Sequence, residues 1–214
     1  MYLKFNLKSK MVKIDFCKTR DVKSPTRNTS TDAGIDFFVP NFTTELDKDD
    51  KVVPNKDSQK FLDDLKEKNK SRKLTIVEPA TLAEPLKILI PSGERVLIPS
   101  GIKVKISRPW YQRILWRLLG LGDALNAENK SGVANKKGLD VGSKVVDQEY
   151  RGEIHISLIN TSNEDIVIES GEKVVQFLHY PIVLSKMNQI SQEEYSKYEN
   201  TERGTGGFGS SGTK

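Results

Sequence analysis

Short segments in which hydrophobic and polar residues alternate recur along most of the chain. Turn-forming sequences such as PSGE, PSG and ESGE separate many of them. The alternating segments lie at residues 11–16, 35–39, 86–90, 95–98, 102–106, 153–159, 165–169 and 173–178. A period of two places successive side chains on opposite faces of a strand, and frequent short strands between turns are typical of antiparallel folds. The pattern therefore predicts an all-β domain, either a sandwich or a barrel.

Residues 41–73 interrupt this pattern with a highly charged stretch. Within it, Phe61, Leu62 and Leu65 are spaced to form one apolar stripe on a short helix. We expect this stretch to be a surface insertion in the β-domain.

A second interruption, at residues 108–125, reads RPWYQRILWRLLGLGDAL. Its apolar residues alternate with arginines, which predicts a basic amphipathic helix. Such a helix can pack on its own domain, and it can also bind a membrane surface or the groove of a partner protein.

Composition sets limits on the class of protein. A chain of 214 residues with 36% hydrophobic and 29% charged residues is suited to a single sizeable core. The 34 basic and 29 acidic residues give a mixed surface, so we expect no direct nucleic-acid binding. Cys17 is the only cysteine, and His155 and His179 are too isolated for a zinc site. Without a membrane-spanning run or a signal sequence, a cytoplasmic protein is expected.

The residues alone leave two interpretations of the segment RGTGGFGSSG at 203–212. Its glycines and serines are typical of a flexible linker. However, glycine-rich backbone can also surround an anion, Arg203 can bind a phosphate through two hydrogen bonds, and Phe208 offers a stacking face.

Five segments, in this order, resemble the five motifs of the trimeric dUTPase family. They are TDAGIDFF at 31–38, ENKSGVA at 128–134, GLDVGSKVVDQEYRGE at 138–153, GEKVVQFLHYP at 171–181 and TERGTGGFGSSG at 201–212. The resemblance implies a jelly-roll or distorted β-barrel with short helical insertions over residues 1–202, a glycine-rich arm at 203–214, and a homotrimer. It also implies that dUTP is hydrolysed to dUMP and pyrophosphate, which limits uracil incorporation into DNA and supplies dUMP for dTMP synthesis.

The third motif is expected to bind the base. Its GLDVGSKVVD segment predicts a hairpin whose main-chain groups can distinguish uracil from cytosine. By resemblance, Gly142 and Ser143 lie near the uracil, and Val146 also belongs to the substrate-binding residues.

The resemblance gives two further residues of this motif a role in the reaction. Tyr150 is expected to lie under the deoxyribose, where its ring fills the space of a 2′-hydroxyl. Asp147 corresponds to the carboxylate that activates the attacking water, so it is expected to be the general base. Arg151 is expected to brace the fold.

The first motif supplies the acidic group of the metal site. By resemblance, Asp36 holds water in the coordination shell of Mg²⁺, and Asp32 is a weaker candidate. A single carboxylate is sufficient because Mg²⁺ retains several waters and binds substrate phosphates directly.

The second and fourth motifs are expected to bind the phosphates. Ser131 and the Gly132 amide would lie at the start of a short helix, and Gln176 would contact both the phosphate chain and the second motif. Lys130 stands where the family usually has arginine, and an ammonium group cannot make the planar two-point contact of a guanidinium.

The resemblance also implies that each active site is shared among three subunits, one of which lends its arm. Arg203 would then bind the γ-phosphate and Phe208 would stack on uracil. Gly209, Ser210 and Ser211 would line the phosphates. The arm is thus expected to close over a bound nucleotide.

Two other functions fit part of the sequence. The related dCTP deaminases share the β-fold but lack a tail of this form, and deamination of dCTP would identify them. A regulatory binding protein is the other alternative, since the insertions at 41–73 and 108–125 could contact a protein or a membrane surface.

Overall fold

The chain folds mainly into β-strands. A computed structural model describes residues 12–202 and 204, which contain fourteen strands and four helices. The strands are β1 (Lys13–Lys18), β2 (Ile35–Phe38), β3 (Thr44–Leu46), β4 (Val52–Pro54), β5 (Thr75–Val77), β6 (Lys87–Ile90), β7 (Arg95–Pro99), β8 (Ile102–Ser107), β9 (Leu121–Glu128), β10 (Leu139–Val141), β11 (Val145–Asp147), β12 (His155–Asn160), β13 (Ile166–Glu169) and β14 (Lys173–Val183). The helices are α1 (Lys56–Lys68), α2 (Trp110–Leu118), α3 (Ser131–Lys137) and α4 (Gln192–Ser196). The expected all-β class is confirmed.

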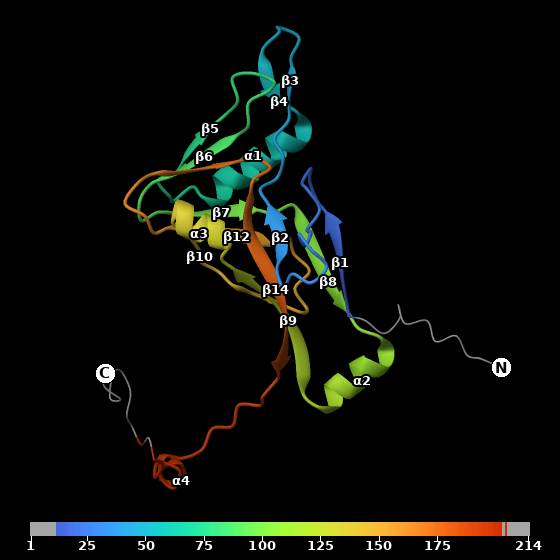
Figure 1. Cartoon of the computed structure of the whole chain (residues 1–214), viewed down its shortest axis with the longest axis vertical. Coiled ribbons are helices and arrows are strands. Elements are labelled where there is room, and N and C mark those ends of the chain that lie inside the picture. The colour runs from blue at the N-terminus through green and yellow to red at the C-terminus, as the bar shows by residue number, and fades with distance from the viewer. Residues whose placement is uncertain (1–11, 203, 205–214) are drawn as a thin grey trace, which may run out of the picture. The chain divides into compact units, whose positions relative to one another are not determined.

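The strands pair in antiparallel fashion and form small sheets (Figure 1). The largest has the order β11-β9-β14-β2, and two three-stranded sheets have the orders β10-β12-β7 and β13-β6-β5. In the described residues, two further sheets contain the pairs β1-β8 and β3-β4. Neighbours in these sheets are mostly distant in sequence, so long-range pairing determines the topology.

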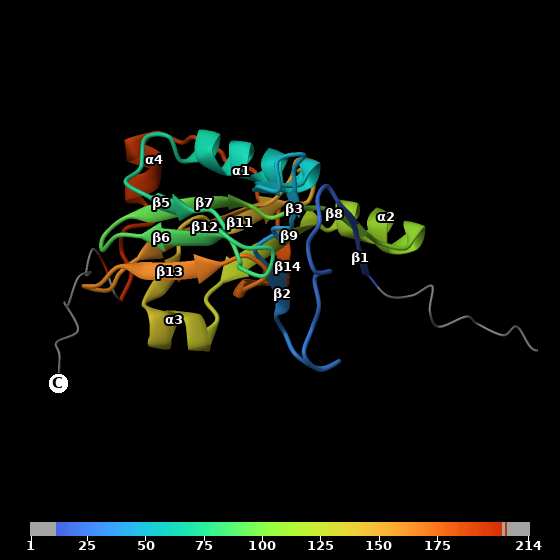
Figure 2. The ribbon, with the colours of Figure 1, turned by 90° about the horizontal axis from the view of Figure 1, so that it is seen from above.

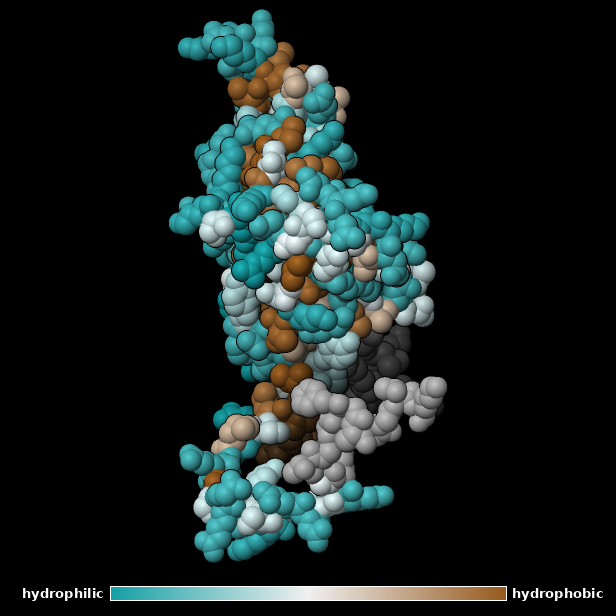
Figure 3. Space-filling model, turned by 90° about the vertical axis from the view of Figure 1, so that its left-hand side faces the viewer, coloured by the Kyte–Doolittle hydropathy of each residue, from teal (hydrophilic) through white to brown (hydrophobic). Residues whose placement is uncertain are grey.

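The hydrophobic core follows from the alternation in the strands. In β6, Ile88 and Ile90 are fully buried while Lys87 is exposed, and in β12 the side chains of Ile156 and Leu158 are buried. The face of the molecule in Figure 3 is mainly hydrophilic, with hydrophobic residues in small groups.

Helix α1 contributes to the core and is more than a surface insertion. Its predicted stripe of Phe61, Leu62 and Leu65 is buried, with relative exposures of 1%, 1% and 0%. The Asn69 side chain fixes the end of the helix to β7, because Nδ2 donates to the Leu97 carbonyl and Oδ1 accepts from the Leu97 amide, both at 2.9 Å. Figure 2 shows α1 covering the layer that contains β7.

The expected helix at 108–125 is correct only in its first half. Helix α2 ends at Leu118, and Gly120 adopts a positive φ of 64°, a conformation that commonly ends helices. Residues Leu121–Glu128 then form β9, which pairs with β14 along its whole length. The sequence LGDALNAE is a central strand of the largest sheet because pairing on both sides outweighs its helical composition.

The described residues divide into two compact units between Val183 and Leu184. The first unit contains the β-sheets, and the second contains α4, in which the Ser191 hydroxyl accepts a hydrogen bond from the Glu194 amide. None of the helices in the described part of the chain is long and apolar enough to cross a membrane.

Candidate active site

Asp36 is the buried centre of a cluster of charges. The residue lies on β2, is only 4% exposed, and uses both carboxylate oxygens in ion pairs. Lys130 Nζ donates to Oδ1 at 2.5 Å, and Lys173 Nζ lies 2.9 Å from Oδ2. One carboxylate is thus held between two ammonium groups, so the cluster carries a net positive charge.

This cluster lines a polar cavity of about 540 Å³. The cavity brings together residues of the first, second and fourth motifs, as the sequence predicts. Its lining residues are Asn28, Asp32, Ala33, Gly34, Asp36, Lys130, Lys173 and Gln176. Lys173 is a cationic residue that the sequence analysis overlooked, and its place two residues after the glycine of the fourth motif was the available signal.

Gln176 is positioned by pairing and by a close backbone approach. It lies directly opposite Asp36 in the β14-β2 ladder, and its Nε2 donates to the Asn129 carbonyl at 2.8 Å. The expected contact between Gln176 and the second motif is confirmed. A Cβ atom at Gly34 would lie 2.0 Å from Gln176 Oε1, so a larger residue here would displace the Gln176 side chain.

Asn129 links the second motif to the third, which the sequence analysis did not predict. Its Oδ1 accepts from the Val141 amide at 2.8 Å, and its Nδ2 donates to Asp140 Oδ1 at 2.7 Å. With the Gln176 hydrogen bond, Asn129 connects three of the motifs.

The second motif begins a helix as expected. Lys130 is the N-cap residue of α3, and both Ser131 and Gly132 are exposed in the first turn. The amides of a first helical turn have no acceptor within the helix. They can therefore donate to a ligand.

The expected hairpin in the third motif does not form. Strand β10 pairs with β12, whereas β11 pairs with β9 in another sheet. The Gly142 amide donates to the Ser157 carbonyl at 2.9 Å, and a Cβ at this position would lie 2.7 Å from Ser157 Oγ. Residues 142–144 thus connect two sheets, because each strand finds its partner far away in the sequence.

The side chains of the third motif differ in their exposure to solvent. Ser143 and Asp147 are exposed, and Val146 is partly buried against the core. Tyr150 is 43% exposed; its hydroxyl donates to the Glu153 carbonyl at 2.9 Å, and its ring covers Gly152. Tyr150 is therefore fixed in place while part of it remains accessible.

Arg151 has the bracing contacts expected of it. Its Nη1 donates to the carbonyls of Gln148 and Tyr150, and its Nη2 donates to Glu149. These bonds close the turn that follows β11.

Asp147 lies far from the cavity within one chain. It is on β11 and Asp36 is on β2, at opposite edges of the four-stranded sheet. Three strand spacings separate them laterally by about 14 Å, and the register adds four residues along the strands, or about 13 Å. The two residues are thus roughly 19 Å apart.

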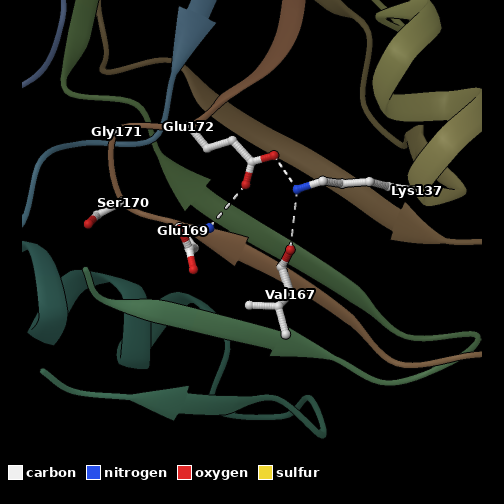
Figure 4. Close-up of a pocket in the computed structure, with 6 residues that line it drawn as sticks. All are labelled: Lys137, Val167, Glu169, Ser170, Gly171 and Glu172. Carbon is white, nitrogen blue, oxygen red and sulfur yellow. Dashed lines mark hydrogen bonds and ion pairs between the residues drawn. The ribbon is translucent and has the colours of Figure 1, made fainter. Parts of the chain in front are cut away.

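A second cavity, of about 440 Å³, is lined by Lys137, Val167, Glu169, Ser170, Gly171 and Glu172 (Figure 4). Lys137 Nζ is paired with the Glu172 carboxylate, whose other oxygen accepts from the Glu169 amide. Lys137 and Glu172 thus satisfy one another, Glu169 pairs with Lys87 outside the cavity, and the lining contains none of the predicted site residues.

Several known proteins are similar to this chain. The dUTPase family model matches residues 127–212. The chain is 39% identical over 132 residues to deoxyuridine 5′-triphosphate nucleotidohydrolase of Rickettsia bellii, a match that covers 62% of this chain and 77% of the relative. The chain belongs to the dUTPase family. The corresponding protein of Hahella chejuensis is 34% identical over 137 residues, covering 63% of this chain and 78% of that one.

Solved dUTPases have the same fold. Staphylococcus bacteriophage 80alpha dUTPase, solved with dUpNHpp, has a TM-score of 0.56 at 20% identity and covers 94% of this chain and 99% of its own. A mutant dUTPase from phage phi11 of S. aureus, described with a structural Mg(II) ion, has a TM-score of 0.50 at 16% identity and covers 85% and 99%.

The cavity can accommodate the magnesium that the family implies. The described residues contain no group of three or more His, Cys, Asp or Glu side chains able to hold a metal ion. The cavity does contain hard oxygen donors from Asp32, Asp36 and Asn28. Such a donor set suits Mg²⁺ that is bound through its waters and through substrate phosphates.

Five predicted residues of the arm, Arg203, Phe208, Gly209, Ser210 and Ser211, lie outside the residues that the structure describes.

Proposed function

We propose that this protein hydrolyses dUTP to dUMP and pyrophosphate, and thereby limits uracil incorporation into DNA and supplies dUMP for dTMP synthesis. The observation that carries this proposal is the polar cavity in which Asp36, Lys130 and Gln176 converge. The chain that forms this cavity is a member of the dUTPase family. Two lysines in its lining suit a polyanion such as a triphosphate.

The phosphates bind at the second and fourth motifs. Lys130 and Lys173 supply charge, Gln176 supplies an amide, and the exposed first turn of α3 supplies donors from Ser131 and Gly132. When phosphate oxygens enter, they compete with Asp36 for the two ammonium groups. Asp36 would then hold Mg²⁺ through water, and the metal ion would neutralise the charge that develops on the phosphates.

Uracil and deoxyribose bind at the third motif. Since the Gly142 amide already donates to Ser157, recognition of the base falls to the Gly142 carbonyl and the main chain of Ser143, with Val146 beneath. The accessible part of Tyr150 contacts the sugar and excludes a 2′-hydroxyl.

Asp147 is the general base. It orients a water molecule for in-line attack on the α-phosphorus, accepts the proton as the new P–O bond forms, and pyrophosphate leaves as the bond to the bridging oxygen breaks. The reaction depends on positioning and charge stabilisation, without a covalent intermediate.

The separation of Asp147 from Asp36 supports a site shared between subunits. A distance of roughly 19 Å is too long for both residues to act on one triphosphate within a single chain. A homotrimer would unite Asp147 of one copy with Asp36 of the next and create three sites. Arg203, Phe208, Gly209, Ser210 and Ser211 of the arm would then bind the nucleotide at the γ-phosphate, the base and the phosphate chain.

The test is pyrophosphate release from dUTP, dCTP, dTTP and UTP, with and without Mg²⁺. We expect marked preference for dUTP, dependence on Mg²⁺, and a decrease in kcat of about 100-fold or more for Asp147→Asn. Glu149→Gln, an exposed carboxylate two residues away, is the matched control and should retain activity. Equal rates on all four nucleotides, full activity of Asp147→Asn, or deamination of dCTP would contradict the proposal.

A further inference from the structure

Helix α2 exposes nearly all of its hydrophobic side chains. Trp110 is 73% exposed and Leu118 is 79% exposed, and no residue of the helix is buried. The other exposed hydrophobic residues of this segment are Tyr111, Ile114, Leu115 and Leu119. Figure 1 shows the helix at the end of the domain where β8 ends and β9 begins. This concentration of exposed apolar side chains indicates a binding surface.

The opposite side of α2 is fixed to the domain. Arg108 stacks on Trp116, with Cζ 3.2 Å from the ring centroid, and donates two hydrogen bonds to Asp123 on β9 at 2.7 and 2.6 Å. His179 Nε2 lies 2.6 Å from the same carboxylate. Since this side of the helix is held against the domain, the opposite side faces outward.

The outward side has a continuous apolar arc. At 100° per residue, Trp110, Ile114 and Leu118 form one row, and Tyr111 and Leu115 form the adjacent row. Both aromatic residues lie at the first turn. Aromatic rings of this kind are typical of membrane–water interfaces.

Arginines flank this arc. Arg113 and Arg117 lie next to the row of Trp110, are exposed, and have no ion-pair partner among the described residues. The stretch from residue 108 to residue 122 contains no aspartate or glutamate. The surface is therefore both apolar and purely cationic.

We propose that α2 is an interfacial helix that binds an anionic lipid bilayer. The apolar arc enters the boundary between headgroups and acyl chains, and Arg113 and Arg117 bind the phosphate groups of the lipids. A helix of nine residues is too short to span a bilayer, so it lies in the plane of the surface. Charge complementarity favours this occupant, because an anionic bilayer offers phosphate groups to Arg113 and Arg117 next to an apolar interior for the arc.

Flotation of the full-length protein with vesicles tests the proposal. We expect binding to phosphatidylcholine mixed with phosphatidylglycerol, and little binding to phosphatidylcholine alone. Leu118→Glu should abolish binding. Arg113→Gln combined with Arg117→Gln should weaken it roughly 30-fold, because each arginine near an anionic surface contributes a factor of about five.

Matched controls isolate the surface. Leu82→Glu changes another exposed leucine, 56% exposed against 79% for Leu118. Lys48→Gln with Lys51→Gln removes two exposed cations elsewhere. Both should bind like the wild type. Circular dichroism verifies that every variant is folded. Flotation measures vesicle binding directly, so the result does not depend on catalytic activity.

Three results would overturn the proposal. The first is the absence of binding to anionic vesicles, and the second is binding that the α2 variants retain. The third is a change in assembly size in Leu118→Glu without vesicle binding by the wild type, which would identify the surface as a contact between copies of this chain.

Discussion

The side chain of Gln176 donates a 2.8 Å hydrogen bond to the backbone carbonyl of Asn129. This bond joins the β-strand that carries the fourth motif to the turn that precedes α3. This amide therefore helps to hold the turn beside Asp36, to which Lys130 of the same turn also donates directly.

Gly34→Ala should displace this amide, because the new Cβ would lie 2.0 Å from Gln176 Oε1. We expect kcat/KM for dUTP to fall about 100-fold, the scale of a misplacement near 1 Å. In a Gln176→Ala background the added methyl group should cost much less, since Oε1 and Cδ, the two atoms closest to it, are gone and only Cβ remains, at 3.1 Å. An equal loss in both backgrounds would show that the glycine acts independently of Gln176.

Asn129→Ala should destabilise the junction between the second and third motifs. The Val141 amide loses its acceptor, and an unpaired buried group costs about 1–3 kcal/mol in unfolding free energy. Urea denaturation measures the change. Asn126→Ala is the control, since Asn126 donates to the nearby Glu128 side chain and should affect stability less. Equal effects of the two substitutions would contradict a bridging role for Asn129.

Phe61→Ala should destabilise the whole β-domain rather than α1 alone. Its ring is buried in the core, and removal of a buried phenylalanine costs about 3–5 kcal/mol. Leu46→Ala, at a position 51% exposed, should change the unfolding free energy by less than about 0.5 kcal/mol. If thermal unfolding of Phe61→Ala matched that of Leu46→Ala, α1 would be a dispensable addition.

The Arg108–Asp123–His179 cluster should make stability depend on acid pH. Burial raises the pKa of Asp123, but hydrogen bonds from Arg108 and His179 outweigh burial and leave the pKa below its usual range. The ionised form thus stabilises the fold above the unfolded pKa of about 3.9, and this stability is lost as the pH falls toward the lower folded pKa.

Asp123→Asn should therefore be less stable than the wild type at neutral pH and lose less stability on acidification below about pH 4. Thermal unfolding across this pH range measures both effects. Asp49→Asn, an exposed change in the β3–β4 turn, should follow the wild-type profile. An Asp123→Asn profile parallel to the wild type would contradict the role of the cluster.

The sequence by itself determined the local features. Alternation located most strands because burial of one face of a strand is a local property of residues such as Ile88 and Ile90. The spacing of Phe61, Leu62 and Leu65 likewise located α1, and the resemblance to the family motifs assigned Asp36 and Gln176 to one site.

Only the tertiary structure decided which strands pair and how far apart the site residues lie. The expected hairpin failed because β10 and β11 found partners in different sheets, and LGDALNAE became β9 because β14 and β11 pair with it. The contacts of Asn129, the burial of α1 and the separation of Asp147 from Asp36 have the same origin. Each results from contacts between residues that are distant in the sequence. A local sequence pattern carries no information about the free energy of such contacts.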